Sequence, residues 1–98
     1  MRITVARSGG YAGIVEEPTT IDTEDLDAAT AERLEDIVNE IGFFTLPAQT
    51  GGVGADMFTY EISVSDDTGR THVVSFVDDG SQETAPLRRL VEAVTAAV

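Results

Sequence analysis

One histidine, a glycine-rich segment and several acid pairs are the parts of this sequence whose residue types could do chemistry. His72 is the only histidine and cysteine is absent, so nucleophilic catalysis would need Ser8, His72 and an aspartate to meet as a triad. No nucleophile-elbow motif is present. His72 alternates with Thr71 and Val73 in a strand-like run, where a hydrogen-bonded or exposed histidine is the simpler interpretation. We therefore predict that the protein is not an enzyme.

Metal and cofactor chemistry has equally little support. One histidine and no cysteine leave carboxylates as the ligands, which favours a hard cation such as Ca²⁺. The pairs Asp66-Asp67 and Asp78-Asp79 precede glycines but lack the alternating oxygen ligands of a calcium loop. Gly52-Val53-Gly54 precedes a strand instead of a helix and lacks the third glycine of a dinucleotide fingerprint. No cofactor is expected.

Binding through loops remains. The segment Ser8, Gly9, Gly10, Tyr11, Ala12 and Gly13 places one aromatic ring among residues with almost no side chain. In one interpretation Tyr11 projects from a slim backbone that can enter a cleft. In the other, the segment is a hairpin that needs glycine dihedral angles, and Tyr11 folds onto the sheet. The connection from Ala48 to Met57, with its Gly51 to Asp56 loop, is either a second contact or a flexible link.

Four strands are expected to position these segments. Apolar and polar residues alternate over Met1–Arg7 and Phe58–Ser65, which is the period of a half-buried strand. Ile14–Ile21 contains Pro18, so it should lie at an edge or carry a bulge. Thr71–Val77 is nearly continuously apolar towards its end, which predicts a central strand buried on both faces.

Two helices are expected from apolar residues at steps of three and four. The first runs from Asp27 to Ile41, with Gly42 as its C-cap, and Phe43–Pro47 should pack its end onto the sheet. The second begins near Pro86 after a polar loop, Asp78–Thr84. The order ββαββα predicts an α+β fold, a four-stranded antiparallel sheet with two amphipathic helices packed on one face, as a single domain over residues 1–98.

Net charge excludes several partners. The 98 residues hold 6 basic and 18 acidic side chains, for a net charge of −12. Nucleic acid and anionic membranes both repel such a protein, so neither is an expected partner. No run approaches the ~20 apolar residues of a membrane span, and no signal-peptide pattern is present, which predicts a cytoplasmic protein. The segment 8–13 carries no acid, so the charge should serve solubility and steering around a neutral binding edge.

Several blocks along the chain resemble one protein family. They are Arg2-Ile3-Thr4-Val5 leading into Arg7-Ser8-Gly9-Gly10-Tyr11-Ala12-Gly13, then Thr20-Ile21-Asp22-Thr23, Phe43-Phe44-Thr45-Leu46-Pro47, Gly54-Ala55-Asp56-Met57-Phe58-Thr59-Tyr60 and Ala85-Pro86-Leu87-Arg88-Arg89-Leu90. Together they cover essentially the whole chain and resemble emfourin, the protealysin-associated inhibitors of thermolysin-like metallopeptidases. The most specific block is Ser8 to Gly13, where Tyr11 stands in place of an expected phenylalanine and keeps the ring.

The resemblance implies a protein inhibitor whose partner is a thermolysin-like (protealysin-like) metallopeptidase. On this hypothesis Tyr11 fills or borders the apolar pocket beside the zinc, while Ser8, Gly9, Gly10, Ala12 and Gly13 let the backbone approach. Asp56 is a further candidate for contact near the zinc. The alternative is an acidic interaction or regulatory module, such as a nucleic-acid mimic, with no peptidase target.

Overall fold

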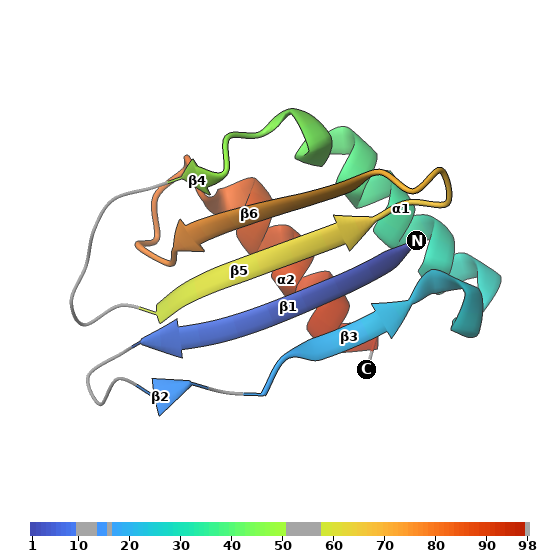
Figure 1. Ribbon diagram of the computed structural model, residues 1–98, viewed down its shortest axis with the longest axis horizontal. Coiled ribbons are helices and arrows are strands. Elements are labelled where there is room, and N and C mark those ends of the chain that lie inside the picture. Colours follow the sequence, from blue (N-terminus) through green and yellow to red (C-terminus); the bar gives the residue numbers. More distant parts are fainter. Residues whose placement is uncertain (10–13, 16, 51–57, 98) are drawn as a thin grey trace.

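The protein is an α+β fold in which one sheet supports two helices (Figure 1). The computed structural model describes residues 1–9, 14–15, 17–50 and 58–97. The strands are β1 (Arg2–Gly9), β2 (Ile14–Val15), β3 (Thr19–Asp22), β4 (Gln49–Thr50), β5 (Phe58–Ser65) and β6 (Thr71–Val77). Four of them pair antiparallel in the order β3-β1-β5-β6. The two-residue strands lie beside them, β2 antiparallel to β1 and β4 parallel to β6. The predicted order ββαββα is confirmed.

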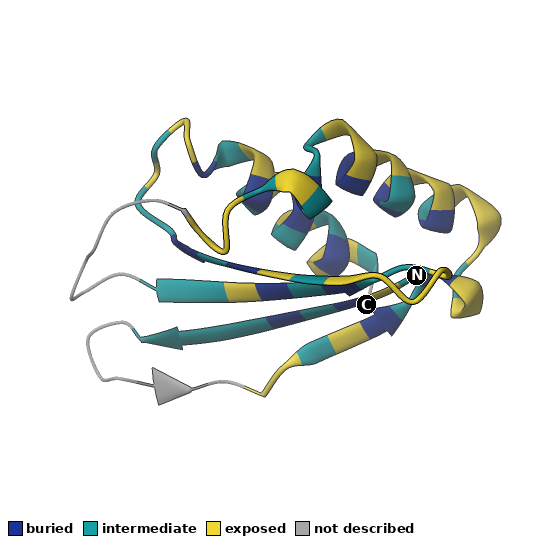
Figure 2. Cartoon of the chain, turned by 45° about the horizontal axis from the view of Figure 1, so that its top comes forward, coloured by how far each residue is buried: buried dark blue, intermediate teal, exposed yellow. Residues whose placement is uncertain are grey.

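The helices are α1 (Ala28–Glu40) and α2 (Ala85–Ala97), and both cover the same face of the sheet (Figure 2). Short 3-10 turns, Thr23–Asp25 and Phe43–Thr45, lie on either side of α1. The core forms where the apolar stripe of each helix meets the inner side of the sheet. Its most buried members are Ile3, Leu34, Ile37, Val38, Phe43, Ile62, Val64, Val74, Phe76, Leu87, Leu90 and Val94.

The ends of α1 follow the local signals in the sequence. Asp27 is the N-cap, and its carboxylate accepts hydrogen bonds from the Thr30 backbone nitrogen (3.1 Å) and hydroxyl (2.6 Å). These contacts lower the pKa of Asp27. At the other end Gly42 takes the left-handed conformation, φ 64°, which a glycine adopts without the cost of a Cβ. The predicted helix therefore differs from the observed one only by its capping residues.

The predicted second strand is divided into two. Ile14–Val15 and Thr19–Asp22 pair with β1 alone among the described strands, and Glu17 and Pro18 lie between them outside any strand. Proline has no N–H to donate to a sheet, so the ladder is interrupted at this point. The expectation of an edge strand with an irregularity at Pro18 is confirmed.

The predicted end of the first strand is wrong. Ser8 and Gly9, expected to open a loop, belong to β1 and are paired on both sides, Ser8 with Thr59 and Val15, Gly9 with Phe58. Gly9 holds φ 91°, a value open to glycine at little cost. Pairing to two neighbouring strands extends the ladder past the point where local propensity would end it.

The expectation that β6 is buried on both faces is also wrong. Val74 and Phe76 face the helices, whereas Val73 on the outer face is 40% exposed. The helices leave that outer face uncovered, and β4 pairs with β6 only at Ser75 and Phe76. The strands with long partners on both sides are β1 and β5.

The turn between β5 and β6 is organised around the Asp66 carboxylate. It accepts hydrogen bonds from the Thr68 hydroxyl (2.7 Å) and the Thr68 and Arg70 backbone nitrogens (3.0 Å each), and Arg70 Nε donates to the second oxygen at 3.0 Å. The guanidinium of Arg70 also lies 3.8 Å from the ring centroid of Phe44. These bonds, that of the Thr68 hydroxyl first, lower the pKa of Asp66 from 3.8 to about 2.

We expect the stability that Asp66 provides to depend on pH in the acid range. Because folding lowers the pKa of Asp66, its contribution is fully present above pH 3.8 and is lost as the pH falls towards about 2. A carboxyl NMR titration should place the folded pKa of Asp66 near 2, and the urea midpoint should fall over the same range. Asp66→Asn should remove this part of the acid dependence. A folded-state pKa near 3.8 would contradict the expectation.

Candidate functional site

Three segments of the chain meet at one end of the sheet (Figure 1). The β1–β5 ladder ends at the pair Gly9 and Phe58, and Gly9 also faces Ile14 of β2. The backbone nitrogen of Asp78, the first residue after β6, donates to the Phe58 carbonyl at 2.9 Å. Because these residues flank the segments 10–13, 51–57 and 78–84, all three leave or enter the sheet at this end, which we call the loop-bearing end.

The sequence-predicted site falls partly outside the described residues. Ser8 and Gly9 lie in the last ladder positions of β1. Gly10, Tyr11, Ala12 and Gly13 lie outside the described residues, as does Asp56 in the second segment. Among the described residues, Gly9 of the first predicted segment and Phe58, which follows the second, are direct partners in the ladder.

Contacts between aromatic rings and with Arg7 on the inner side of the sheet stabilise the loop-bearing end. Phe58 lies under the guanidinium of Arg7, with 4.2 Å between the guanidinium carbon and the ring centroid. One step further in, Tyr60 and Phe76 stack with 5.2 Å between centroids and an interplanar angle of 15°. Contacts of both kinds stabilise when they are desolvated. They tie β1, β5 and β6 together directly behind the segments that leave the sheet.

A third segment at this end was not predicted as part of any site. The sequence predicts only a polar loop over Asp78–Thr84, whereas in the structure hydrogen bonds hold this loop in place. Asp79 Oδ1 accepts from the Ser81 backbone nitrogen (2.9 Å) and the Thr84 hydroxyl (3.2 Å). Arg88 of α2 donates to the Thr84 hydroxyl (2.8 Å) and the Ser81 carbonyl (3.2 Å) and lies 3.6 Å from Asp78. The sequence signal, an arginine one turn into the helix after a Ser/Thr/Asp loop, is common and weak.

The Ser8–His72 pair cannot form a catalytic triad. Ser8 lies opposite Thr59 and His72 opposite Val64, so five residues of β5 separate them, about 17 Å at ~3.4 Å per residue. Thr59 and Val64 also point to opposite faces of the sheet. His72 Nε2 lies 2.7 Å from the Leu46 carbonyl oxygen, to which it donates. The interpretation of His72 as a hydrogen-bonded strand residue is confirmed.

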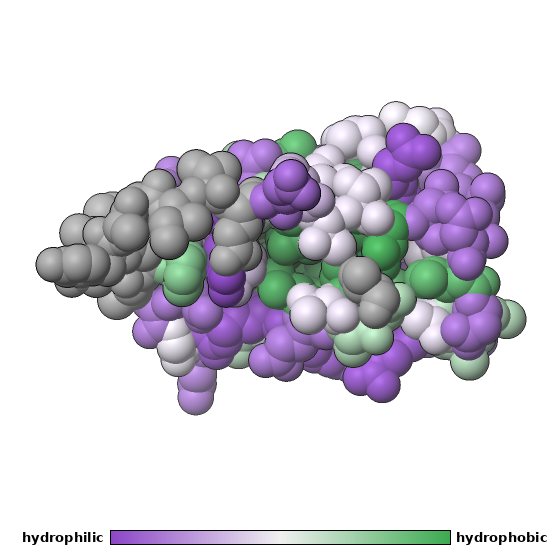
Figure 3. Space-filling model, turned by 90° about the horizontal axis from the view of Figure 1, so that it is seen from below, coloured by the Kyte–Doolittle hydropathy of each residue, from purple (hydrophilic) through white to green (hydrophobic). Residues whose placement is uncertain are grey.

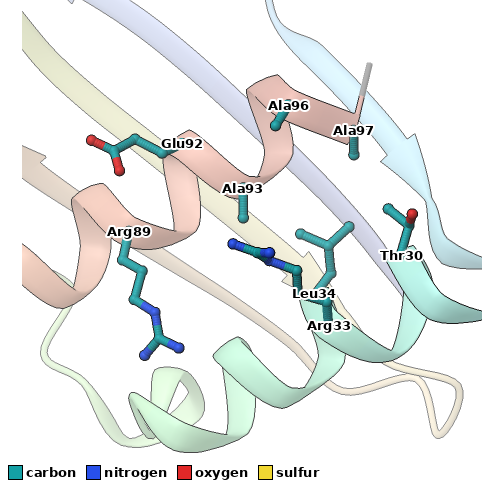
Figure 4. A pocket seen from close by; sticks show the side chains of 8 residues that line it. All are labelled: Thr30, Arg33, Leu34, Arg89, Glu92, Ala93, Ala96 and Ala97. Carbon is teal, nitrogen blue, oxygen red and sulfur yellow. The ribbon is translucent and has the colours of Figure 1, made fainter.

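A groove lies between α1 and α2 on the helical side of the molecule (Figure 4). Its volume is about 420 Å³, with Arg33 and Arg89 reaching into the space between the helices above an alanine-rich wall of α2. Arg89 is held by Glu40 of α1 at 2.9 Å. The Thr30 hydroxyl at the groove's end already bonds to Asp27, so the groove contains no activated nucleophile.

A smaller hollow of about 290 Å³ lies between the sheet and the end of α2, beside the loop-bearing end. It is lined by Val5, Arg7, Glu17, Thr19, Tyr60, Val91 and Thr95.

The side of the molecule seen in Figure 3 has apolar surface in its middle and hydrophilic side chains at its right-hand end. Among the described residues no cluster of histidine and acidic side chains could hold a metal ion. Nor is any helix among them long and apolar enough to cross a membrane.

The fold and its loop-bearing end define a small α+β scaffold suited to binding through loops. The Emfourin family model matches residues 5–95, nearly the whole chain, and the chain belongs to the Emfourin family. This is a family of inhibitors, and membership indicates a metallopeptidase inhibitor with a peptidase as its partner. No curated protein and no solved structure matches the chain.

Proposed function

We propose that the protein inhibits thermolysin-like zinc metallopeptidases by inserting the segment around Tyr11 into the substrate cleft. The observation that carries this proposal is the ladder pair Gly9 and Phe58, since Gly9 belongs to the first predicted segment and Phe58 follows closely on the second. Family membership supports the class of partner. The ring contacts behind Phe58 support a rigid base for the inserted segment.

Insertion of this segment would block the cleft without cleavage. Thermolysin-like clefts are similar in accepting a bulky apolar residue just after the scissile bond, beside a zinc held by two histidines and one glutamate. Tyr11 would fill or border that pocket, and Ser8, Gly9, Gly10, Ala12 and Gly13 would allow the backbone to approach closely. A backbone held out of line with the zinc-bound water is a poor substrate, and preorganisation lowers the entropy cost of binding.

The first experiment is a titration of thermolysin-like peptidases, protealysin-like enzymes among them, with the purified protein. We expect a stoichiometric loss of activity on a peptide substrate, reversed by dilution. Full activity at a large excess of the folded protein, over a panel of such peptidases, would refute the proposed function.

We also propose that the encounter occurs in the cytoplasm. Disulfides do not form readily there, and a chain without cysteine needs none to fold.

Asp56 should provide a weaker contact than Tyr11. Asp56→Asn removes the charge and keeps the shape, so we expect inhibition to weaken by about tenfold if the carboxylate faces the zinc or its ligands, in line with ~1.4 kcal/mol per factor of ten. Inhibition constants measured at fixed pH and salt provide the readout. Asp36→Asn, on the exposed side of α1, is the matched control. An unchanged constant for Asp56→Asn would assign Asp56 a structural role.

The alternative function is an acidic interaction module that occupies a basic partner. The net charge of −12 favours it. Affinity that rests on surface charge falls steeply as salt rises. An inserted segment loses less equilibrium affinity and shows salt mainly in its association rate. Binding measured between low and high salt therefore separates the two functions.

A further inference from the structure

We propose that the loop Asp78–Thr84 is a third, preorganised wall of the peptidase-binding end and contacts the rim of the cleft through Glu83. This inference rests on the proposed function. It concerns a segment that neither the sequence analysis nor the family match assigns to the site. Every residue of the loop lies within the described structure.

The position of the loop is set by the sheet. Val77 is the ladder partner of Thr59, and the next residue, Asp78, donates its backbone N–H to the Phe58 carbonyl. Phe58 in turn pairs with Gly9. The loop therefore begins at the end of β6, which β5 separates from the end of β1 (Figure 1). Its first residue lies beside Phe58, the first residue of β5.

The loop is held by side chains, unlike an ordinary surface connection. Thr84 is fully buried, its hydroxyl bonds to Asp79, and Arg88 closes the loop from the side of α2. Gly80 takes φ 74° at an exposed position with nothing near its missing Cβ, so a positive φ explains the glycine. Because these groups are already ordered, a partner that binds the loop pays little of the entropy that loop ordering normally costs.

The size of a specific interface also requires more than two segments. Stable protein complexes use about 20–30 residues on each side, whereas the predicted segments Ser8 to Gly13 and Gly51 to Asp56 hold six residues each. The loop 78–84 is a described segment that starts at the same end of the sheet, where the Asp78 backbone nitrogen bonds to the Phe58 carbonyl. Its exposed side chains are Gln82 and Glu83, and the Glu83 carboxylate would face cationic or hydrogen-bond-donating groups on the rim of the cleft.

Charge reversal at the loop tests the inference. Glu83→Arg should raise the inhibition constant by about tenfold or more, because it introduces a larger side chain of opposite charge into the contact. Glu32→Arg is the matched control, since it makes the same change of net charge on the exposed side of α1 and should leave the constant within about twofold. Both variants should keep the wild-type thermal midpoint, because both side chains are exposed.

A second pair of variants tests the preorganisation. Arg88→Met removes the groups that close the loop, whereas Arg89→Met removes the neighbouring charge that pairs with Glu40 on the far side of the helix. Arg88→Met should weaken inhibition several-fold more than Arg89→Met, and amide exchange of residues 79–83 should slow on complex formation. If wild-type protein inhibits and neither Glu83→Arg nor Arg88→Met differs from its control, the third wall is refuted while the proposed function stands. If the wild type does not inhibit any such peptidase, both fall together.

Discussion

Replacing Tyr11 by alanine is expected to abolish most of the inhibitory affinity. A buried aromatic anchor at the centre of an interface contributes about 2–4 kcal/mol on truncation, which corresponds to roughly a 30- to 1000-fold higher inhibition constant. The neighbours of Tyr11 are glycines and an alanine, so no adjacent side chain could take over the pocket. Inhibition constants and dissociation rates measured against one susceptible thermolysin-like peptidase provide the readout, with most of the change expected in the dissociation rate.

The conservative variant makes this test specific. Tyr11→Phe keeps the ring and removes the hydroxyl, so it should inhibit within a few-fold of the wild type. Equilibrium urea unfolding of both variants shows whether each remains folded, so that a change in inhibition can be assigned to binding. A folded Tyr11→Ala protein with an unchanged inhibition constant would remove Tyr11 from the binding role and leave the second segment or the loop 78–84 as the leading contact.

Replacing Phe43 by alanine is expected to cause the largest loss of stability. Phe43 is fully buried, and its ring meets those of Phe44 and His72 edge to face, at centroid distances of 5.9 and 5.6 Å. A buried Phe→Ala change costs about 3–5 kcal/mol, whereas a protein of this size has about 5–15 kcal/mol in total. The variant should therefore unfold at much lower urea, and part of it should be unfolded without denaturant at the lower end of that range.

Phe44→Ala is the matched control for this prediction. Phe44 is half-buried, with Arg70 over its ring at 3.8 Å, so its truncation should cost only about 1–2 kcal/mol. Equilibrium urea unfolding of the two variants, with the slope held in common, gives the comparison. Equal losses would show that the packing of Phe43 against His72 contributes little, contrary to the structure.

Signals that act over a few residues were sufficient for much of the fold. Strict alternation over Phe58–Ser65 predicts a strand with its bounds, because neighbouring side chains of a strand point to opposite faces. Asp27 and Gly42 mark the ends of α1, since capping depends on residues within one turn of the helix end. The order of the elements then determined the class of fold, because two amphipathic helices must cover an apolar sheet face.

Which of several similar residues is buried or paired depends on contacts with distant parts of the chain. Phe43 and Phe44 are alike as sequence, and the packing of the core determines that Phe43 is fully buried while Phe44 lies partly exposed at its edge. Ser8 and Gly9 have loop-like propensity, but the neighbouring strands β2 and β5 include them in the sheet. Val73 has strand propensity on either face, and its exposure follows from the helices covering the other side of the sheet.

The sequence by itself therefore determined the elements, their order, the family resemblance and a candidate binding segment free of acidic residues. The tertiary structure decided which strand ends lie together and that Arg88 holds the loop 78–84 beside them. The physical reason is the range of the interactions. Periodicity and capping depend on residues within about one turn, whereas ladder pairs such as Gly9 and Phe58 join residues that only the folded chain brings together.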